Sequence, residues 1–266
     1  MFGFGKKKKE KVKEEKDQAG CFVGMVLLSS AEWDKSQFIS DLQETWAIKI
    51  GEEDQDEKYK DIIVTEIGNM RLAISFVPVP VPDQEAEFYA EGNYMWPDAV
   101  STVKKHQAHI MVAVLGDGKD YPEKGRLFTK AVDACLRQKS AVAAYTDGAV
   151  FEPGFYRDFA ALMEGDAIPV FNLVWFGIYK NGNQIGVYTY GMKKFGKDEM
   201  EVYVDNQDAD LNDVREFLSD MVSYVLEEDV ILNDGETIGF SEEQKLLITK
   251  SKGIALDGMS LKIAYN

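Results

Sequence analysis

Two glutamates, Glu199 and Glu201, stand two residues apart in the segment YTYGMKKFGKDEMEVYV, residues 188–204. The end of this segment alternates as a β-strand does, so both carboxylates are expected on one face, opposite the core. Two carboxylates on an open face can bind a cation or a basic partner. General acid–base catalysis would also require a pocket that shifts one pKa. A solvated strand face, a binding surface and a carboxylate-based enzyme site therefore stand as alternatives.

Histidines and cysteines are too few for the common catalytic and metal sites. The chain has two histidines, His106 and His109, and no G-x-S-x-G turn, so a Ser-His-Asp triad is not indicated. Together with two distant cysteines, Cys21 and Cys135, they do not form a closed zinc set. We therefore expect structural or exposed histidines, no metal, and two free thiols in a reducing compartment.

Two loops resemble ligand-binding motifs at first sight. The segment LGDGKDYPEKGR, residues 115–126, lies between a predicted strand and a predicted helix, but its glycines lack the spacing of a phosphate-binding loop. The segment DNQDADLND, residues 205–213, lacks the glycine and the final glutamate of a calcium loop. A plain turn and a set of helix-capping acids are the expected structures, and no cofactor is expected.

A predicted hairpin at residues 172–190 carries aromatic side chains on both of its strand faces. Its turn is predicted at Asn181-Gly182. The aromatic residues are Trp175, Phe176, Tyr179, Tyr188 and Tyr190. A hairpin that is covered on both sides and an aromatic patch that meets a partner are the two interpretations.

Charge divides the 266-residue chain into a short basic segment and a long acidic one. Residues 1–20 hold seven lysines and four acids. The remaining residues hold 23 basic and 42 acidic side chains, which gives them a formal charge of −19. Such a body repels nucleic acids and anionic lipids, and it favours a basic protein partner. The tail is expected to be a solvated, disordered leader, with contact to a membrane surface or a nucleic acid as the alternative.

No apolar run is long enough to span a bilayer, and no signal-peptide core follows the lysines, so a cytoplasmic protein is expected. Residues 21–116 follow the order strand, helix, strand, strand, helix, strand, with a short turn at Gly68-Asn69, and a further helix (122–138) and strand (141–146) complete the first half, residues 21–146. This order is typical of the ferredoxin-like βαββαβ fold. Residues 147–266 are predicted to form an antiparallel-rich α+β half, packed with the first half in one α+β unit. Its clearest helix lies within residues 208–228.

The C-terminal residues resemble a known family. The segment YTYGMKKFGKDEMEV, the long helix ending SYVLEEDVILNDGETIGFS and the closing strand pair are similar to the bacterial domain-of-unknown-function family 4261, over about residues 186–266. The positions that carry the resemblance are Gly191, Phe195, Gly196, Glu199, Glu201 and residues 234–239. The resemblance implies a bacterial accessory protein of the binding or immunity type, and it brings no catalytic residues.

The segment DGETIG, residues 234–239, is predicted to be a turn followed by an extended piece. We expect it to lie beside the glycine-rich kink at 191–196, with Asp234 or Glu236 near Glu199. Taken together, the sequence favours a non-catalytic protein-binding module with an acidic surface. The alternative is an enzyme with a carboxylate-based site at Glu199, Glu201 and this turn.

Overall fold

The computed structural model describes residues 19–51, 54, 60–146, 148–163, 165, 167–205, 209–239 and 244–265. The chain divides into two compact units, one formed by Gly20–Leu173 and one that contains Val174–Asn266. We call them the N-terminal unit and the C-terminal unit and describe each by itself. The predicted basic tail, apart from its last two residues, lies outside the described part of the chain.

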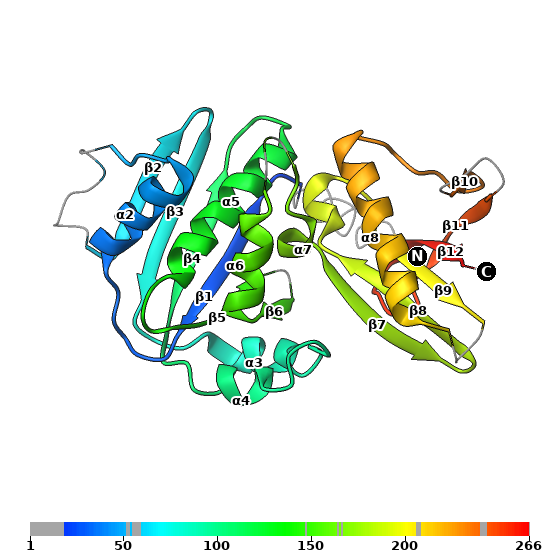
Figure 1. The fold of residues 1–266 in the computed structure, drawn as a ribbon, viewed down its shortest axis with the longest axis horizontal. Coiled ribbons are helices and arrows are strands. Elements are labelled where there is room, and N and C mark those ends of the chain that lie inside the picture. The colour runs from blue at the N-terminus through cyan, green and yellow to red at the C-terminus, as the bar shows by residue number, and fades with distance from the viewer. Residues whose placement is uncertain are drawn as a thin grey trace, which may run out of the picture. The chain divides into compact units, whose positions relative to one another are not determined.

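Six strands form the sheet of the N-terminal unit, in the order β2-β3-β4-β1-β5-β6 (Figure 1). Every neighbouring pair is antiparallel. The predicted two-residue turn at Gly68-Asn69 joins β2 to β3, and Gly68 adopts a φ of 61° there. The strands are β1 (Phe22–Leu28), β2 (Ile62–Ile67), β3 (Met70–Val77), β4 (Ala108–Leu115), β5 (Ala141–Thr146) and β6 (Ala149–Phe151).

Helices cover one side of this sheet along its length: α2 (Lys35–Trp46), α5 (Tyr121–Leu136), α6 (Pro153–Ala161) and α7 (Val170–Leu173). Phe22 of β1 packs against Phe128 of α5, with ring centroids 6.2 Å apart. Residues 22, 24, 26 and 28 therefore face the helices, because side chains alternate along a strand. Asp34 caps the start of α2, since its side chain accepts from the backbone N–H of Gln37.

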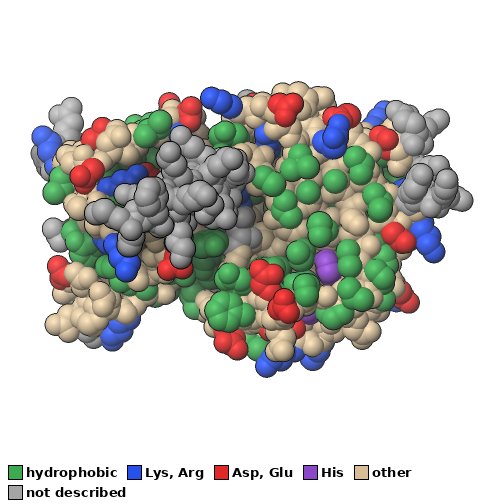
Figure 2. All heavy atoms as spheres, turned by 180° about the vertical axis from the view of Figure 1, so that it is seen from behind, with side chains coloured by type: hydrophobic (Ala, Val, Ile, Leu, Met, Phe, Trp, Pro, Cys, Tyr) green, Lys and Arg blue, Asp and Glu red, His purple; other side chains and the backbone are tan. Residues whose placement is uncertain are grey.

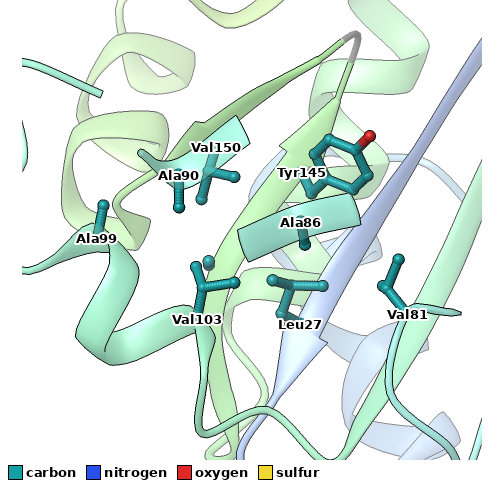
Figure 3. Packing of buried hydrophobic residues seen from close by; sticks show 9 residues of the cluster. Leu27, Val81, Ala86, Ala90, Ala99, Val103, Tyr145 and Val150 are labelled. Atoms are coloured by element: carbon teal, nitrogen blue, oxygen red, sulfur yellow. The ribbon is translucent and has the colours of Figure 1, made fainter. Parts of the chain in front are cut away.

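The other side of the sheet is covered only in part. Two short helices, α3 (Glu85–Ala90) and α4 (Ala99–Val103), pack over the end formed by β1, β5 and β6, and a 3-10 helix, Pro82–Gln84, precedes them. Figure 3 shows small side chains of these helices against larger ones of the sheet. The buried cluster consists of Leu27, Val81, Ala86, Ala90, Ala99, Val103, Ala143, Tyr145 and Val150.

The predicted ferredoxin-like arrangement of the first half is not confirmed. In a split βαβ pattern, the strands that flank a helix are parallel and enclose a third strand. The strands that flank α2 are β1 and β2, and they run antiparallel with β3 and β4 between them. In addition, β4 lies between β1 and β3 and pairs with both, whereas the predicted fold would make β3 a direct neighbour of β1. The only such pattern among the described strands is formed by β4, α5 and β5, which enclose β1.

The first unit extends beyond residue 146, where the sequence places the boundary between the halves. Strand β6 pairs with β5, and α6 and α7 pack on α5. Asn172, which is completely buried, donates from its side chain to the backbone oxygen of Tyr156. These contacts tie residues 149–173 to the first sheet.

The C-terminal unit has its own six-stranded sheet, in the order β10-β11-β12-β9-β8-β7 (Figure 1). Strands β12 and β9 are parallel and the other pairs are antiparallel. The chain is thus a mixed α+β protein with two antiparallel-rich sheets. The strands are β7 (Trp175–Asn181), β8 (Gln184–Tyr190), β9 (Met200–Val204), β10 (Thr237–Ile238), β11 (Leu246–Lys252) and β12 (Met259–Ala264).

One long helix, α8 (Leu211–Glu227), packs on strands β8 and β9. It lies within residues 208–228, where a helix is predicted, one face of it is apolar and buried, and Asp210 caps its start. The predicted hairpin of β7 and β8 is present, but its turn lies one residue later than predicted. Asn181 pairs with Gln184, so Gly182 and Asn183 form the loop. Among the described residues, no helix is both long enough and apolar enough to cross a bilayer.

Candidate functional site

The seven candidate binding residues from the glutamate pair, the aromatic hairpin and the family resemblance all lie in the C-terminal unit. Four are buried: Trp175, Phe195, Glu199 and Glu201. Three are exposed: Tyr190, Asp234 and Glu236. The expectation that Glu199 and Glu201 form a solvated strand face is therefore wrong, since Glu201 has no exposed surface and Glu199 is 5% exposed. A buried carboxylate needs hydrogen-bond donors, and the structure supplies them to both.

Glu199 binds the kink that follows β8. One of its oxygens accepts from the backbone N–H groups of Gly191 and Met192, both at 2.9 Å, and from that of Lys193 at 3.4 Å. The other oxygen accepts from the hydroxyl of Thr189 at 2.7 Å. The kink is a 3-10 helix, Met192–Phe195, and a glycine in the left-handed region stands at each end, Gly191 and Gly196. The carboxylate thus accepts hydrogen bonds from backbone N–H groups that have no partner within the turn.

Burial raises the pKa of the Glu199 carboxyl above its usual range, and its four hydrogen bonds act in the opposite direction. No ion pair to Glu199 is found among the described residues. The charge of this carboxylate is therefore balanced by backbone and hydroxyl dipoles rather than by a cation.

Glu201 binds a second loop, which joins β11 to β12. Its two oxygens accept from the backbone N–H of Ile254 at 2.9 and 3.0 Å, and one also accepts from that of Ala255 at 2.8 Å. The hydroxyl of Ser260 donates to it at 3.0 Å, and the ammonium of Lys262 lies 3.8 Å away. Glu199 and Glu201 thus belong to two separate networks. Each carboxylate fixes a different loop, and the two share no partner.

The turn at residues 234–239 reaches the Glu199 kink only indirectly. The carboxylate of Asp234 accepts from the backbone N–H of Lys250 at 2.8 Å, and the side chain of Lys250 pairs with Asp198 at 2.5 Å. Glu236 accepts from the backbone and side chain of Asn233, which lowers the pKa of the Glu236 carboxyl. Lys250 therefore links the turn to the residue that precedes Glu199.

Residues 188–264 match a known family model, that of a domain of unknown function, DUF4261. The resemblance predicted from the C-terminal residues is confirmed. The DUF4261 region spans β8 to β12 and α8, and it contains both buried glutamates and the 234–239 turn. No curated protein and no solved structure matches the chain.

The aromatic residues of the hairpin are mostly covered. Trp175 and Phe176 are 8% and 3% exposed, whereas Tyr190, the cross-strand partner of Trp175, is 42% exposed. The rings of Tyr179 and Tyr188 lie across the glycines that pair with them, Gly186 and Gly177. The covered hairpin is therefore the better of the two interpretations, and Tyr190 is its one largely exposed aromatic residue among those described.

The DUF4261 region also holds an acidic surface that the sequence analysis missed. Exposed side chains recur along the outer face of α8 at intervals of three or four residues, and four of them are acidic. A fifth exposed acid, Glu228, directly follows the helix as its C-cap. No ion pair to these five is found in the described part of the chain. The five acidic residues, with Tyr224 among them at 50% exposure, are Asp213, Glu216, Asp220, Glu227 and Glu228. The signal that could have predicted this surface is the helical spacing of the acids within residues 208–228.

The remaining candidates from the sequence have structural roles. The ammonium of Lys124, which is 3% exposed, donates to the backbone oxygens of Gly116 and Gly118, so it closes the 115–126 loop internally. His106 is held on both ring nitrogens, by Val81 and Val103. Cys21 and Cys135 are free. Within the described residues, no group of three or more His, Cys, Asp or Glu side chains is arranged to hold a metal ion.

Proposed function

We propose that the chain is a non-catalytic protein-binding module whose C-terminal unit binds a basic protein through the outer face of α8. The observation that carries this proposal is the row of exposed carboxylates along the outer face of α8 and at its C-cap, to which no ion pair is found among the described residues. Like charges at such spacing destabilise an isolated helix by a few tenths of a kcal/mol per pair, roughly. A basic partner would supply the missing counter-charges.

The two buried glutamates support a binding role rather than catalysis. A general acid or base must reach a substrate atom, directly or through one water molecule. The oxygens of Glu199 and Glu201 are instead occupied by loop amides and hydroxyls. Both carboxylates therefore have a structural role, since each holds a loop in a fixed shape.

The class of partner follows from the charge and from the family resemblance. An acidic surface accelerates association with a basic protein, and the complex weakens as salt screens the charges. An immunity-type role, in which the chain neutralises a basic toxin, fits both features. The two free thiols support a cytoplasmic location in a bacterium.

Affinity purification of the tagged chain from its host, at low and at high salt, tests this proposal. Mass spectrometry of the eluate should identify a basic protein that is retained at low salt and lost at high salt. Reversing three charges of the α8 face, Asp213→Lys, Glu216→Lys and Asp220→Lys, should weaken its binding by about tenfold or more, which is about 1.4 kcal/mol or more.

A matched control reverses three exposed acids of the N-terminal unit, Asp83→Lys, Glu85→Lys and Glu91→Lys, and thus changes the net charge equally. It should retain the partner. Equal loss in both triple variants would point to a general charge effect, and retention in both would exclude the α8 face.

A further inference from the structure

The N-terminal unit exposes one side of its sheet in the region that α3 and α4 leave open. Strand pairing places Val23, Ala113, Ala73 and Val64 in one row across β1, β4, β3 and β2. The next row holds Met25, Met111, Ser75 and Ile62, and the last holds Leu115, Arg71 and Glu66. We call these three rows the open face, and Met25 lies at its border, where it packs against the buried cluster under α3 and α4.

The side chains of the open face are apolar to an unusual degree. An antiparallel sheet with one side packed on helices normally presents polar side chains on the other. Here eight of the eleven positions are apolar, and the others are Ser75 and the ion pair of Arg71 with Glu66 at one end. Figure 2 views the molecule from the side opposite α5 and α6, and hydrophobic side chains gather there over this sheet.

Five large side chains of the open face are exposed to about the same extent. They are Val23 at 39%, Ile62 at 46%, Val64 at 46%, Met111 at 37% and Leu115 at 42%. At a strand spacing of about 4.8 Å and a row spacing of about 6.7 Å, four strands and three rows span roughly 400 Å². Two such faces in contact bury roughly 800 Å² before any rim is added, which falls in the range of weak, reversible complexes.

We propose that two copies of this chain associate through their open faces, with the two sheets stacked as in a β-sandwich. Charge favours a second copy at this place. Two chains of formal charge −16 repel each other across most of their surfaces, whereas the open face carries a single neutral ion pair. The area predicts weak association, and the apolar contact predicts that high salt leaves it intact.

Sedimentation velocity of the full chain over a wide concentration range tests the proposal. The weight-average mass should rise from monomer towards dimer. Met111→Glu and Val64→Lys should each raise the dissociation constant by about tenfold or more, because a charge would be buried without a partner. The two substitutions change the net charge in opposite directions, so a common effect separates burial from repulsion.

The matched control is Leu162→Glu, at a position that is 69% exposed and follows α6 on the helix side. It should dimerise as the unaltered chain does. A chain that stays monomeric at every concentration overturns the proposal, whether another protein or another segment covers the face. A dimer that tolerates both face substitutions, or that is lost equally in the control, overturns it as well.

A measurement on the unaltered chain tests the proposal without substitutions, which could prevent folding. Oxidation of Met111 should slow severalfold as the concentration rises, whereas Met95 and Met259, which are 38% and 50% exposed and do not belong to the open face, should react at a constant rate. Equal protection of all three methionines would overturn the proposal. Dimerisation at high salt tests the open face alone, since the proposed basic partner is released there.

Discussion

At the scale of single residues, Glu201 shows how a charged side chain is held inside the C-terminal unit. It has no exposed surface, and it accepts from two backbone amides and one hydroxyl. The substitution Glu201→Gln places an amide group against these donors, because one oxygen becomes an NH₂. We expect the free energy of unfolding to fall by about 3 kcal/mol, measured by urea denaturation.

Glu236→Gln is the matched control, since Glu236 is an exposed carboxyl of the same region. It should change the stability little. A stable Glu201→Gln variant would show that the hydrogen bonds to the 253–258 loop contribute less than the geometry predicts.

At the scale of elements, Asp133 joins three helices of the N-terminal unit. Its side chain is 1% exposed and accepts from Trp46 of α2 at 2.9 Å and from Arg137 at the end of α5 at 3.0 Å. Arg157 of α6 lies 3.5 Å away. Asp133→Ala leaves two guanidinium groups and an indole N–H without this partner. We expect a loss of about 3 kcal/mol in the free energy of unfolding.

Trp46→Phe serves as the comparison, because it removes one hydrogen bond to Asp133 and keeps most of the ring packing. Trp46→Phe should lower the free energy of unfolding by about 1 kcal/mol, measured by the same urea denaturation. Equal losses in the two variants would mean that the arginines add nothing at this junction.

At the scale of the whole molecule, each unit has a complete sheet and a core of its own. We therefore expect chains of residues 20–173 and 174–266 to fold separately, each with a cooperative thermal transition and dispersed amide resonances.

A chain of residues 20–146 is the control, since it ends at the boundary expected from the sequence and lacks β6, α6 and α7. It should show a weaker transition or none, because it loses the Asp133–Arg157 contact and one edge of the sheet. A cooperative 20–146 chain would make the last three elements dispensable.

Local features of this protein were determined by the sequence itself. The Gly68-Asn69 turn, the helix within residues 208–228, the strand at 200–204 and the match of residues 188–264 to a family model all follow from short segments. The reason is that a turn conformation, a helical period and a strand alternation depend on neighbouring residues. The same local rules predicted a hairpin at residues 172–190 and misplaced its turn by one residue.

Only the tertiary structure decided which strands are neighbours and which faces are covered. The element order of residues 21–115 fits a ferredoxin-like fold, but β4 pairs with both β1 and β3. Alternation placed Glu201 away from the core, yet it did not reveal the 253–258 loop that covers it. Alternation likewise did not reveal that large apolar side chains of the open face are exposed in the described part of the chain. Strand neighbours and covering loops come from residues far apart in the chain, and their pairing is a property of the whole fold.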